Sequence, residues 1–261
     1  MLARAPLSEA EWVTLFERAA HMHPLHRSLH MLAAAYRDTA TERGQPGATD
    51  NFNPEQLAEL DMADRNRQLM NLFLENFGAQ LECESNCPQC DEGVELALDL
   101  RRVLADTATT TRTFITTTGG FHISYRLPNT RDLLVTARCG HAATARAELL
   151  AACIVRCERA DDAATVDAGE LPEEVLQHVA EQMGRCDPHA EILARLTCPE
   201  CATPFRIMVD IADLLWAKIV ARAKTALRAV HVLARAYGWS EADILNMSEP
   251  RRALYLSLVD A

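Results

Sequence analysis

The chain has 261 residues and carries 37 acidic against 26 basic side chains, which gives a formal net charge of −11. Hydrophobic residues make up 49% of the composition and charged residues 24%, an ordinary globular profile that allows one large domain or two modest ones. Nonspecific binding to nucleic acid normally requires a positively charged surface, so the acidic balance argues against nucleic acid as a general partner.

The sequence indicates neither a signal peptide nor a membrane-spanning segment. Residues 1–21 mix charged and apolar side chains at helical spacing, without a continuous apolar core. Elsewhere no stretch approaches the length of about 18 uncharged residues that a transmembrane helix needs. The nine cysteines, an odd number, suit metal ligands and buried thiols in a reducing compartment better than a disulfide framework. We therefore expect a cytoplasmic protein with no membrane partner.

Helical spacing of apolar residues dominates the chain. The predicted helices are residues 7–37 (a second helix starting at Pro24), a helix opening at Asn53-Pro54, residues 64–81 ended by Gly78, 132–156, 171–183, 212–237, 240–245 and 248–259. One strand is predicted at residues 121–127, and polar or acidic loops at residues 41–53, 107–120 and 161–169. Ser8 with Glu11, and Ser240 with Asp243, have the spacing of capping boxes at helix starts.

A short internal repeat interrupts this helical pattern. Its two copies begin with Cys87-Pro88-Gln89-Cys90 and Cys198-Pro199-Glu200-Cys201. Aligned without a gap, the copies share both cysteines, the proline, four apolar positions and an aspartate, which is Asp99 in the first copy and Asp210 in the second. Apolar residues alternate after each pair, so we predict a strand there, with Val94, Leu96 and Leu98 on one face in the first copy and Phe205, Ile207 and Val209 in the second.

Two residues between cysteines let one tight turn direct both sulfurs at the same ion. Zinc in structural sites prefers four thiolates in tetrahedral geometry, and the proline restricts the backbone of the turn. We therefore predict a structural Zn²⁺ bound by Cys87, Cys90, Cys198 and Cys201. Four thiolates fill the coordination sphere and leave no position for a catalytic water, so the metal would hold the fold together.

Other interpretations of the cysteines and histidines are weaker. A redox pair would usually stand where a strand leads into a helix, whereas strand-like residues follow each pair here. Cys83 could substitute as a ligand but breaks the repeat; Cys153 and Cys157 suit core thiols one helical turn apart. Isolated candidates that we do not assign to a site are Cys139-Gly140-His141, Cys186-Asp187-Pro188-His189, and the N-terminal His21, His23, His26 and His30.

These elements predict an α+β protein, mostly helical, with a small zinc-ribbon-like β module formed from the two Cys-Pro-x-Cys units and their strands. The predicted regions are an N-terminal helical region at residues 1–82, the two halves of the module at residues 83–105 and 195–215, an inserted region at residues 106–194 with a strand and helices, and a C-terminal helical region at residues 216–261. We find no phosphate-binding glycine loop, nucleophile elbow or metalloprotease helix, so we expect neither an enzyme nor a small-molecule substrate.

Several segments, taken in order, resemble bacterial proteins of phage baseplates, related to the T-even-type baseplate hub assembly chaperone family. They are Asp64-Arg65-Asn66-Arg67-Gln68-Leu69 through Phe77-Gly78, the two Cys-Pro-x-Cys units, Tyr125-Arg126-Leu127-Pro128 with Asp132-Leu133, and residues 236–245 around Tyr237-Gly238-Trp239. The N-terminal histidines and residues 107–120 are not part of this pattern. The resemblance implies a role in contractile tails or tail-like injection systems, without a mechanism.

Two functional hypotheses follow. The first is a non-enzymatic assembly factor or minor structural component of a contractile tail baseplate, cytoplasmic in bacteria or within the tail-like particle. It would bind baseplate or hub proteins, with Tyr237, Trp239 and Tyr255 as candidate anchors, although the same aromatic residues could simply pack the last helices. The alternative is a zinc-ribbon nucleic-acid-binding or regulatory protein, for which the cationic face of residues 212–237 (Lys218, Arg222, Lys224, Arg228, Arg235) would be the contact surface.

Overall fold

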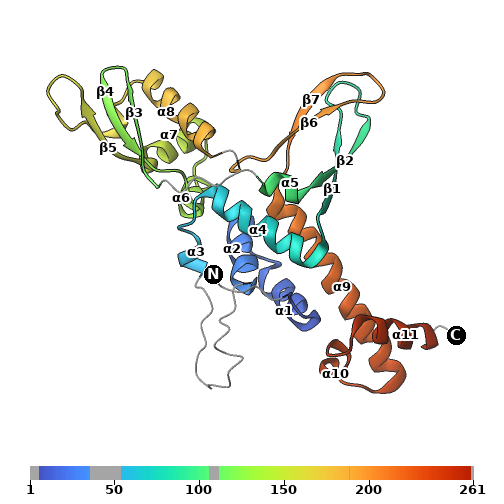
Figure 1. The fold of residues 1–261 in the computed structure, drawn as a ribbon. Helices are drawn as coiled ribbons and strands as arrows, with labels where there is room; N and C mark the ends of the chain where they lie inside the picture. Colours follow the sequence, from blue (N-terminus) through green and yellow to red (C-terminus); the bar gives the residue numbers. More distant parts are fainter. Residues whose placement is uncertain (1–5, 36–53, 106–111, 188, 260–261) are drawn as a thin grey trace, which may run out of the picture. The chain divides into compact units, whose positions relative to one another are not determined.

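The structure is a computed structural model that describes residues 6–35, 54–105, 112–187 and 189–259. It combines helices with small antiparallel sheets, so the expectation of a mixed helical and sheet protein is confirmed (Figure 1). The expected loop at residues 41–53 lies outside the described residues, as do the first residues of the expected loop at 107–120, a threonine-rich segment. Within them, no helix has the combination of length and apolar character that crossing a membrane would need.

The chain divides into two compact units, each built from separate stretches of sequence. The first comprises Met1–Pro54, Leu72–Gly78 and Ile211–Ala261, and the second comprises Glu55–Asn71 and Ala79–Asp210. The helix α4 (Met62–Phe77) contributes to both. The four-part division expected from the sequence stays a prediction, because compactness does not test the boundaries of the cysteine module.

The first unit is helical. Besides the last turns of α4 it contains α1 (Glu9–Ala19), α2 (Pro24–Ala35), α9 (Ile211–Tyr237), α10 (Glu241–Leu245) and α11 (Glu249–Val259). The helices α1, α10 and α11 pack on α9, whose buried residues recur at helical spacing along its whole length. Trp12 of α1 is fully buried, and its ring centroid lies 5.5 Å from that of Phe77. The predicted helix at residues 212–237 is confirmed.

Helix ends in this unit follow the expected signals. The backbone N–H of Ser8 donates to the Glu11 carboxylate at 2.7 Å, and Ser240 and Asp243 exchange side-chain to backbone hydrogen bonds at the start of α10. Gly78 and Gly238 have φ angles of 89° and 70°, the left-handed conformation that ends helices at little cost when the residue is glycine. The N-terminal histidines are exposed or half-buried beside these helices, and none belongs to a metal-binding group among the described residues.

Part of the second unit is a three-stranded antiparallel sheet with helices. The elements are α3 (Pro54–Leu57, whose first residue belongs to the first unit), β3 (Phe114–Thr118), β4 (Phe121–Tyr125), α6 (Thr130–Thr136), α7 (Ala142–Cys153), β5 (Ile154–Arg159), the 3₁₀ helix η2 (Ala168–Glu170) and α8 (Glu173–Cys186). The strand order is β3-β4-β5. Its core buries Ile123 and Tyr125 of β4 against Leu150, Val175 and Val179 of the helices.

The predicted helix at residues 132–156 is wrong. The segment forms α6, a break, α7 and then β5, which follows α7 directly at Ile154. Alanine and leucine are strong helix formers, but tertiary pairing overrides local propensity: β5, which begins with the β-branched residues Ile154 and Val155, pairs with β4. Cys153 and Cys157 are both buried, as expected of core thiols, but Cys157 lies on the strand opposite Ile123.

Strands were also missed in the threonine-rich segment and before each cysteine pair. Residues 114–118 form β3, and Gly119 and Gly120 form the two-residue turn to β4, with φ angles of 56° and 83°. Positive φ at both turn residues is the geometry that matches the twist of a hairpin. The remaining elements are β1 (Gln80–Asn86), β2 (Gly93–Asp99), α5 (Leu100–Leu104), β6 (Leu193–Thr197) and β7 (Pro204–Met208).

Candidate metal centre

Each Cys-Pro-x-Cys segment is the tip of an antiparallel hairpin, β1-β2 in the first copy and β6-β7 in the second. At the first tip the N–H of Cys87 donates to the carbonyl of Glu92 at 2.8 Å, and the N–H of Asp91 donates to the carbonyl of Cys87 at 2.9 Å. The second tip has the same two bonds, each at 3.0 Å. The N–H of Cys198 donates to the carbonyl of Thr203, and the N–H of Ala202 donates to the carbonyl of Cys198. The repeat in sequence is therefore a repeat in backbone structure.

The residue after each pair adopts the same uncommon conformation. Asp91 and Ala202 have φ angles of 60° and 57°, in the left-handed region. For alanine this conformation costs about 1 kcal/mol, because its Cβ crowds the following carbonyl. Because both tips adopt it with different residue types, the geometry of the turn, and not the side chain at this position, determines the backbone there.

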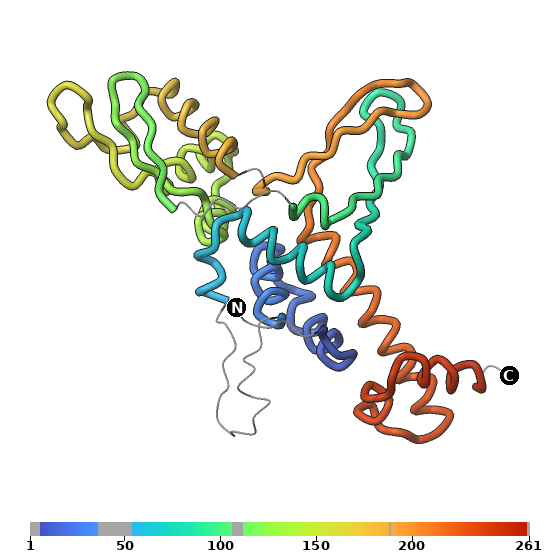
Figure 2. The backbone as a smooth tube through the Cα atoms, in the orientation of Figure 1, coloured from blue at the N-terminus to red at the C-terminus, as the bar shows by residue number. Residues whose placement is uncertain are grey.

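The two tips bring all four predicted cysteines together, although the tips are far apart in the sequence: Cys90 and Cys198 are separated by 108 residues. The Sγ atoms of Cys87, Cys90, Cys198 and Cys201 lie within 4.8 Å of one another, and Figure 2 shows the two hairpins side by side in teal and orange. Three of the Sγ–Sγ distances are 3.5–3.6 Å: Cys87–Cys201, Cys90–Cys198 and Cys90–Cys201. A tetrahedron with metal–sulfur bonds of about 2.3 Å has sulfurs about 3.8 Å apart, whereas a disulfide needs about 2.05 Å.

Burial and charge at the cluster are asymmetric within each pair. Cys87 and Cys198 are buried, whereas Cys90 and Cys201 are exposed. Hydrogen bonds with the side chain and backbone of Thr203 lower the pKa of Cys201 to about 6. At Cys90 a backbone hydrogen bond at Glu92 lowers the pKa, but the hydrogen bond with Cys201, together with burial and the other thiols, raises it to about 12. Four thiolates this close would repel one another, and a metal ion bound between them would compensate their charge.

The other cysteines do not join this cluster, which is the one group with metal-ligand geometry in the described part of the chain. Cys83 is half-buried on β1. Burial raises the pKa of Cys153 to about 12, so its thiol stays protonated in the core. The Sγ of Cys139 donates to the Glu148 carboxylate at 3.0 Å, and Cys139 is separated from the four.

A buried polar network, which the sequence did not reveal, fixes the segment before β6. His189 accepts from the Arg67 guanidinium through Nδ1 (3.0 Å), which leaves Nε2 to donate to the carbonyl of Val103 (2.9 Å). The side-chain amide of Asn66 donates to the carbonyls of His189 and Ala190. Asn66 and Arg67 are among the residues that carry the resemblance, and they hold the chain at the base of the second hairpin.

A second polar network, also formed by residues that carry the resemblance, caps the start of α6. The Arg126 guanidinium donates to both carboxylate oxygens of Asp132, at 2.6 and 2.8 Å, and the same carboxylate accepts from the backbone N–H of Asn129. The side-chain oxygen of Asn129 in turn accepts from the N–H of Asp132. Tyr125 is buried one residue before this arrangement. The shared segment at residues 125–133 therefore turns the chain from β4 into α6, and its polar groups satisfy one another.

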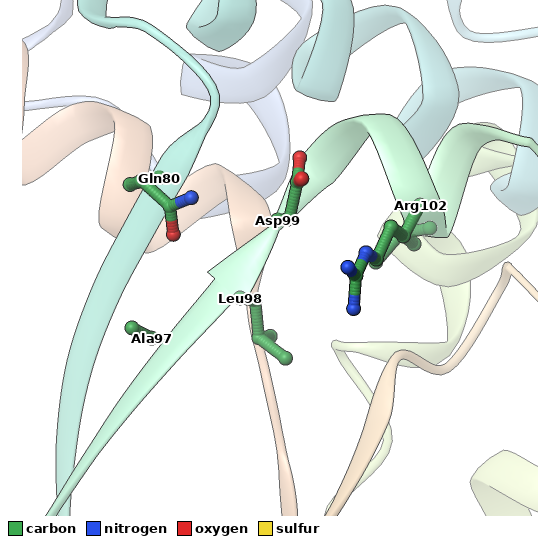
Figure 3. A pocket seen from close by; sticks show the side chains of 6 residues that line it. Gln80, Ala97, Leu98, Asp99 and Arg102 are labelled. Atoms are coloured by element: carbon green, nitrogen blue, oxygen red, sulfur yellow. The ribbon is translucent and has the colours of Figure 1, made fainter.

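A pocket of about 400 Å³ lies at the base of the first hairpin. Figure 3 shows its lining, which comes from β1, β2 and α5: Gln80, Ala97, Leu98, Asp99, Arg102 and Val103. The Asp99 carboxylate accepts from the N–H of Arg101 and thereby caps α5, so it is already used by the backbone. The guanidinium of Arg102 extends beside Leu98 (Figure 3). This lining offers no pair of groups arranged for acid–base catalysis.

The family model described as T4 bacteriophage base plate protein matches residues 47–216, about two thirds of the chain. The matched region includes both hairpins with all four clustered cysteines, the polar network at His189 and the cap of α6. No curated protein and no solved structure matches the chain.

Proposed function

The chain belongs to the T4 bacteriophage base plate protein family, and from that membership we propose that it acts as a non-enzymatic assembly factor or minor structural component of a phage-type contractile tail. The family match over residues 47–216 is the observation that carries this proposal. A baseplate role requires binding to other proteins. The cysteine cluster, the site with the clearest geometry in the described chain, is suited to hold segments of the chain together.

We propose that the ion at the cluster is Zn²⁺ with a structural role. Four sulfur donors at near-tetrahedral spacing suit zinc, which takes thiolate ligands readily and is almost always tetrahedral in structural sites. Four protein ligands leave no open position, so the ion would not activate water or substrate. Its contribution is to join two hairpins that are distant in sequence.

The surface for other baseplate proteins is proposed at the end of the chain. Tyr237, Trp239 and Tyr255 form one aromatic cluster, with ring centroids 4.5 Å apart for the first two and 4.8 Å for the last two. Packing against each other explains part of their position, but Tyr237 remains exposed, and Leu254 and Leu258 of α11 expose 61% and 58% of their surface. Exposed apolar residues beside preordered aromatic rings are typical of protein-binding surfaces.

The cationic face of α9 supports a nucleic-acid role less well. Arg222 is half-buried and its guanidinium donates to the Glu9 carboxylate at 2.9 Å, so it is committed within the chain. Lys218, Lys224, Arg228 and Arg235 are exposed. A patch of four cations on a chain of net charge −11 would bind nucleic acid only weakly, and binding that disappears with added salt would be its signature.

Affinity purification from cells that produce the tail particle tests the proposal. The tagged full-length chain should recover baseplate or hub components, and Trp239→Ala combined with Leu258→Ser should reduce that recovery at least tenfold. A control variant, Ile115→Ser, changes a residue that is 76% exposed on β3 and should not affect recovery. Recovery of no baseplate component, with the particle assembling normally in cells that lack the chain, would refute the role.

A further inference from the structure

The two hairpins of the cysteine module have outward-facing surfaces of opposite charge. Residues directly opposite each other in an antiparallel pair project from the same face. In β1-β2 the exposed face carries the opposed pair Glu84 and Glu95, and in β6-β7 it carries the opposed pair Arg195 and Arg206. The other face of each hairpin carries the more buried residues, such as Leu81 and Ala194.

These two pairs occupy equivalent positions in the repeat. Glu84 and Arg195 each stand three residues before the first cysteine of their copy, and Glu95 and Arg206 each stand five residues after the second cysteine. The backbone repeat therefore places a two-carboxylate pair and a two-guanidinium pair at matching sites, with the charge inverted between copies.

Each pair is unfavourable by itself. Like charges directly opposite on adjacent strands destabilise a hairpin by a few tenths of a kcal/mol or more. None of the four side chains forms an ion pair with another residue in the described ranges. An exposed apolar pair continues the cationic face, because Leu193 and Met208 are directly opposite and expose 52% and 66% of their surface.

We propose that these faces are the two sides of a head-to-tail contact between copies of this chain, in which the Arg195–Arg206 pair of one copy binds the Glu84–Glu95 pair of the next. Within one chain no ion pair joins the two faces in the described residues, so both charged pairs stay available to another copy. Glu82, which is also exposed on the carboxylate face, extends the negative side of the contact.

A contact that joins two different faces leaves one of each free at the ends, so it continues until a ring closes or a chain forms. Bidentate pairing of guanidinium and carboxylate gives such a contact directional specificity. The exposed Leu193 and Met208 add apolar area that the charged groups alone would lack. The strand register and the charges of the repeat support this contact independently of the proposed baseplate role.

Sedimentation velocity of the zinc-loaded, full-length protein over a range of concentrations, up to several hundred micromolar, tests the contact. Wild-type protein should form dimers and larger species at low salt and dissociate at about 0.5 M salt, where exposed charges are screened within a few ångströms. Arg195→Glu/Arg206→Glu and Glu84→Arg/Glu95→Arg should each weaken self-association at least tenfold. Lys218→Glu/Lys224→Glu makes the same change in net charge as the first variant and should associate like wild type.

Mixing the two charge-reversed variants is the decisive measurement. One variant then carries carboxylates on both faces and the other guanidinium groups on both. Each should therefore associate at least tenfold more weakly than wild type when alone, whereas an equimolar mixture should regain the larger species. Zinc content and circular dichroism of each variant show whether the hairpins remain folded. A monomeric wild type at every concentration, variants that associate like wild type, or a mixture that stays monomeric would each overturn the proposal.

Discussion

Replacement of one clustered cysteine tests the metal centre most directly. Cys198 is buried at the tip of the second hairpin, so Cys198→Ser removes a sulfur donor and introduces a buried hydroxyl that is a poor zinc ligand at neutral pH. We expect the bound zinc to fall from one equivalent to well below half. We also expect the protein to lose stability and solubility together, because the two hairpins would no longer be joined.

The magnitude follows from the separation in sequence. The shortest cross-link runs between Cys90 and Cys198, 108 residues apart. Closing a loop of that size restricts the unfolded chain by about 4.7 kcal/mol in the chain-entropy model. The total binding free energy of a structural zinc is larger, on the order of 10 kcal/mol, and includes the metal–ligand bonds themselves. A loss of about 4–5 kcal/mol is comparable to the whole stability of a marginal domain.

The assay is urea unfolding with zinc quantified in the same samples. Wild type treated with chelator should lose as much stability as Cys198→Ser, whereas Cys83→Ser, a half-buried cysteine on the same module, should keep its zinc and lose little stability. Lowering the pH should release the metal, because protons compete for the thiolates. Wild-type protein without stoichiometric zinc, or equal loss of zinc in the Cys83 variant, would refute the assignment of the four ligands.

Three further outcomes are expected. Gly119→Ala should destabilise the second unit by about 2–3 kcal/mol in thermal unfolding, because the φ angle is 56° and the new Cβ would lie 2.6 Å from Val175. Glu9→Ala should cost about 3 kcal/mol, since it strips the carboxylate from the buried guanidinium of Arg252, 3.2 Å away. Burial and the nearby carboxylates raise the pKa of Asp187 to about 7 from 3.8, so wild-type stability should fall as the pH rises from about 4 to 7, and Asp187→Asn should remove that decline.

Each of these three predictions has a control variant or a measurement that could contradict it. Gly120→Ala also has a positive φ angle but no atom within 4 Å of the new Cβ, so it should cost only about 1 kcal/mol, and an equal cost at both glycines would exclude the contact with Val175. Glu17→Ala is an exposed control for Glu9 on the same helix. For Asp187, urea midpoints at pH 5 and pH 8 in excess zinc should converge in the asparagine variant, and an unchanged pH dependence would assign the effect to other groups.

The sequence predicted the elements whose signals are local. The helix α9 has buried residues at helical spacing over its whole length, and the caps at Ser8, Ser240 and Gly238 depend on residues a few positions apart. The cysteine cluster was also predictable, because each tip is a local turn and the repeat shows that two such tips exist. Once the two turns lie side by side, their sulfurs are close enough to share one ion.

What the sequence did not reveal depends on pairing between distant segments. Strand β5 was expected to continue a helix, and its true state is decided by pairing with β4 some thirty residues earlier in the chain. Strand β3 was hidden in a threonine-rich stretch, although the Gly119-Gly120 turn was a signal for a hairpin that could have been used. The contacts of His189 with Arg67 and Val103 join three segments that are distant in sequence, and the spacing of apolar residues gives no signal for contacts of this kind.

The division of both units into separate stretches has a consequence for synthesis of the protein on the ribosome. The first hairpin emerges with Cys87 and Cys90, two of the cluster's four cysteines, long before Cys198 and Cys201 are translated. In the first unit, α1 packs on α9, so it cannot reach its final packing before α9, which begins at Ile211, has been made. Neither unit can therefore close before the last quarter of the chain is made, and all four thiolates can hold the ion only after Cys201 has been translated.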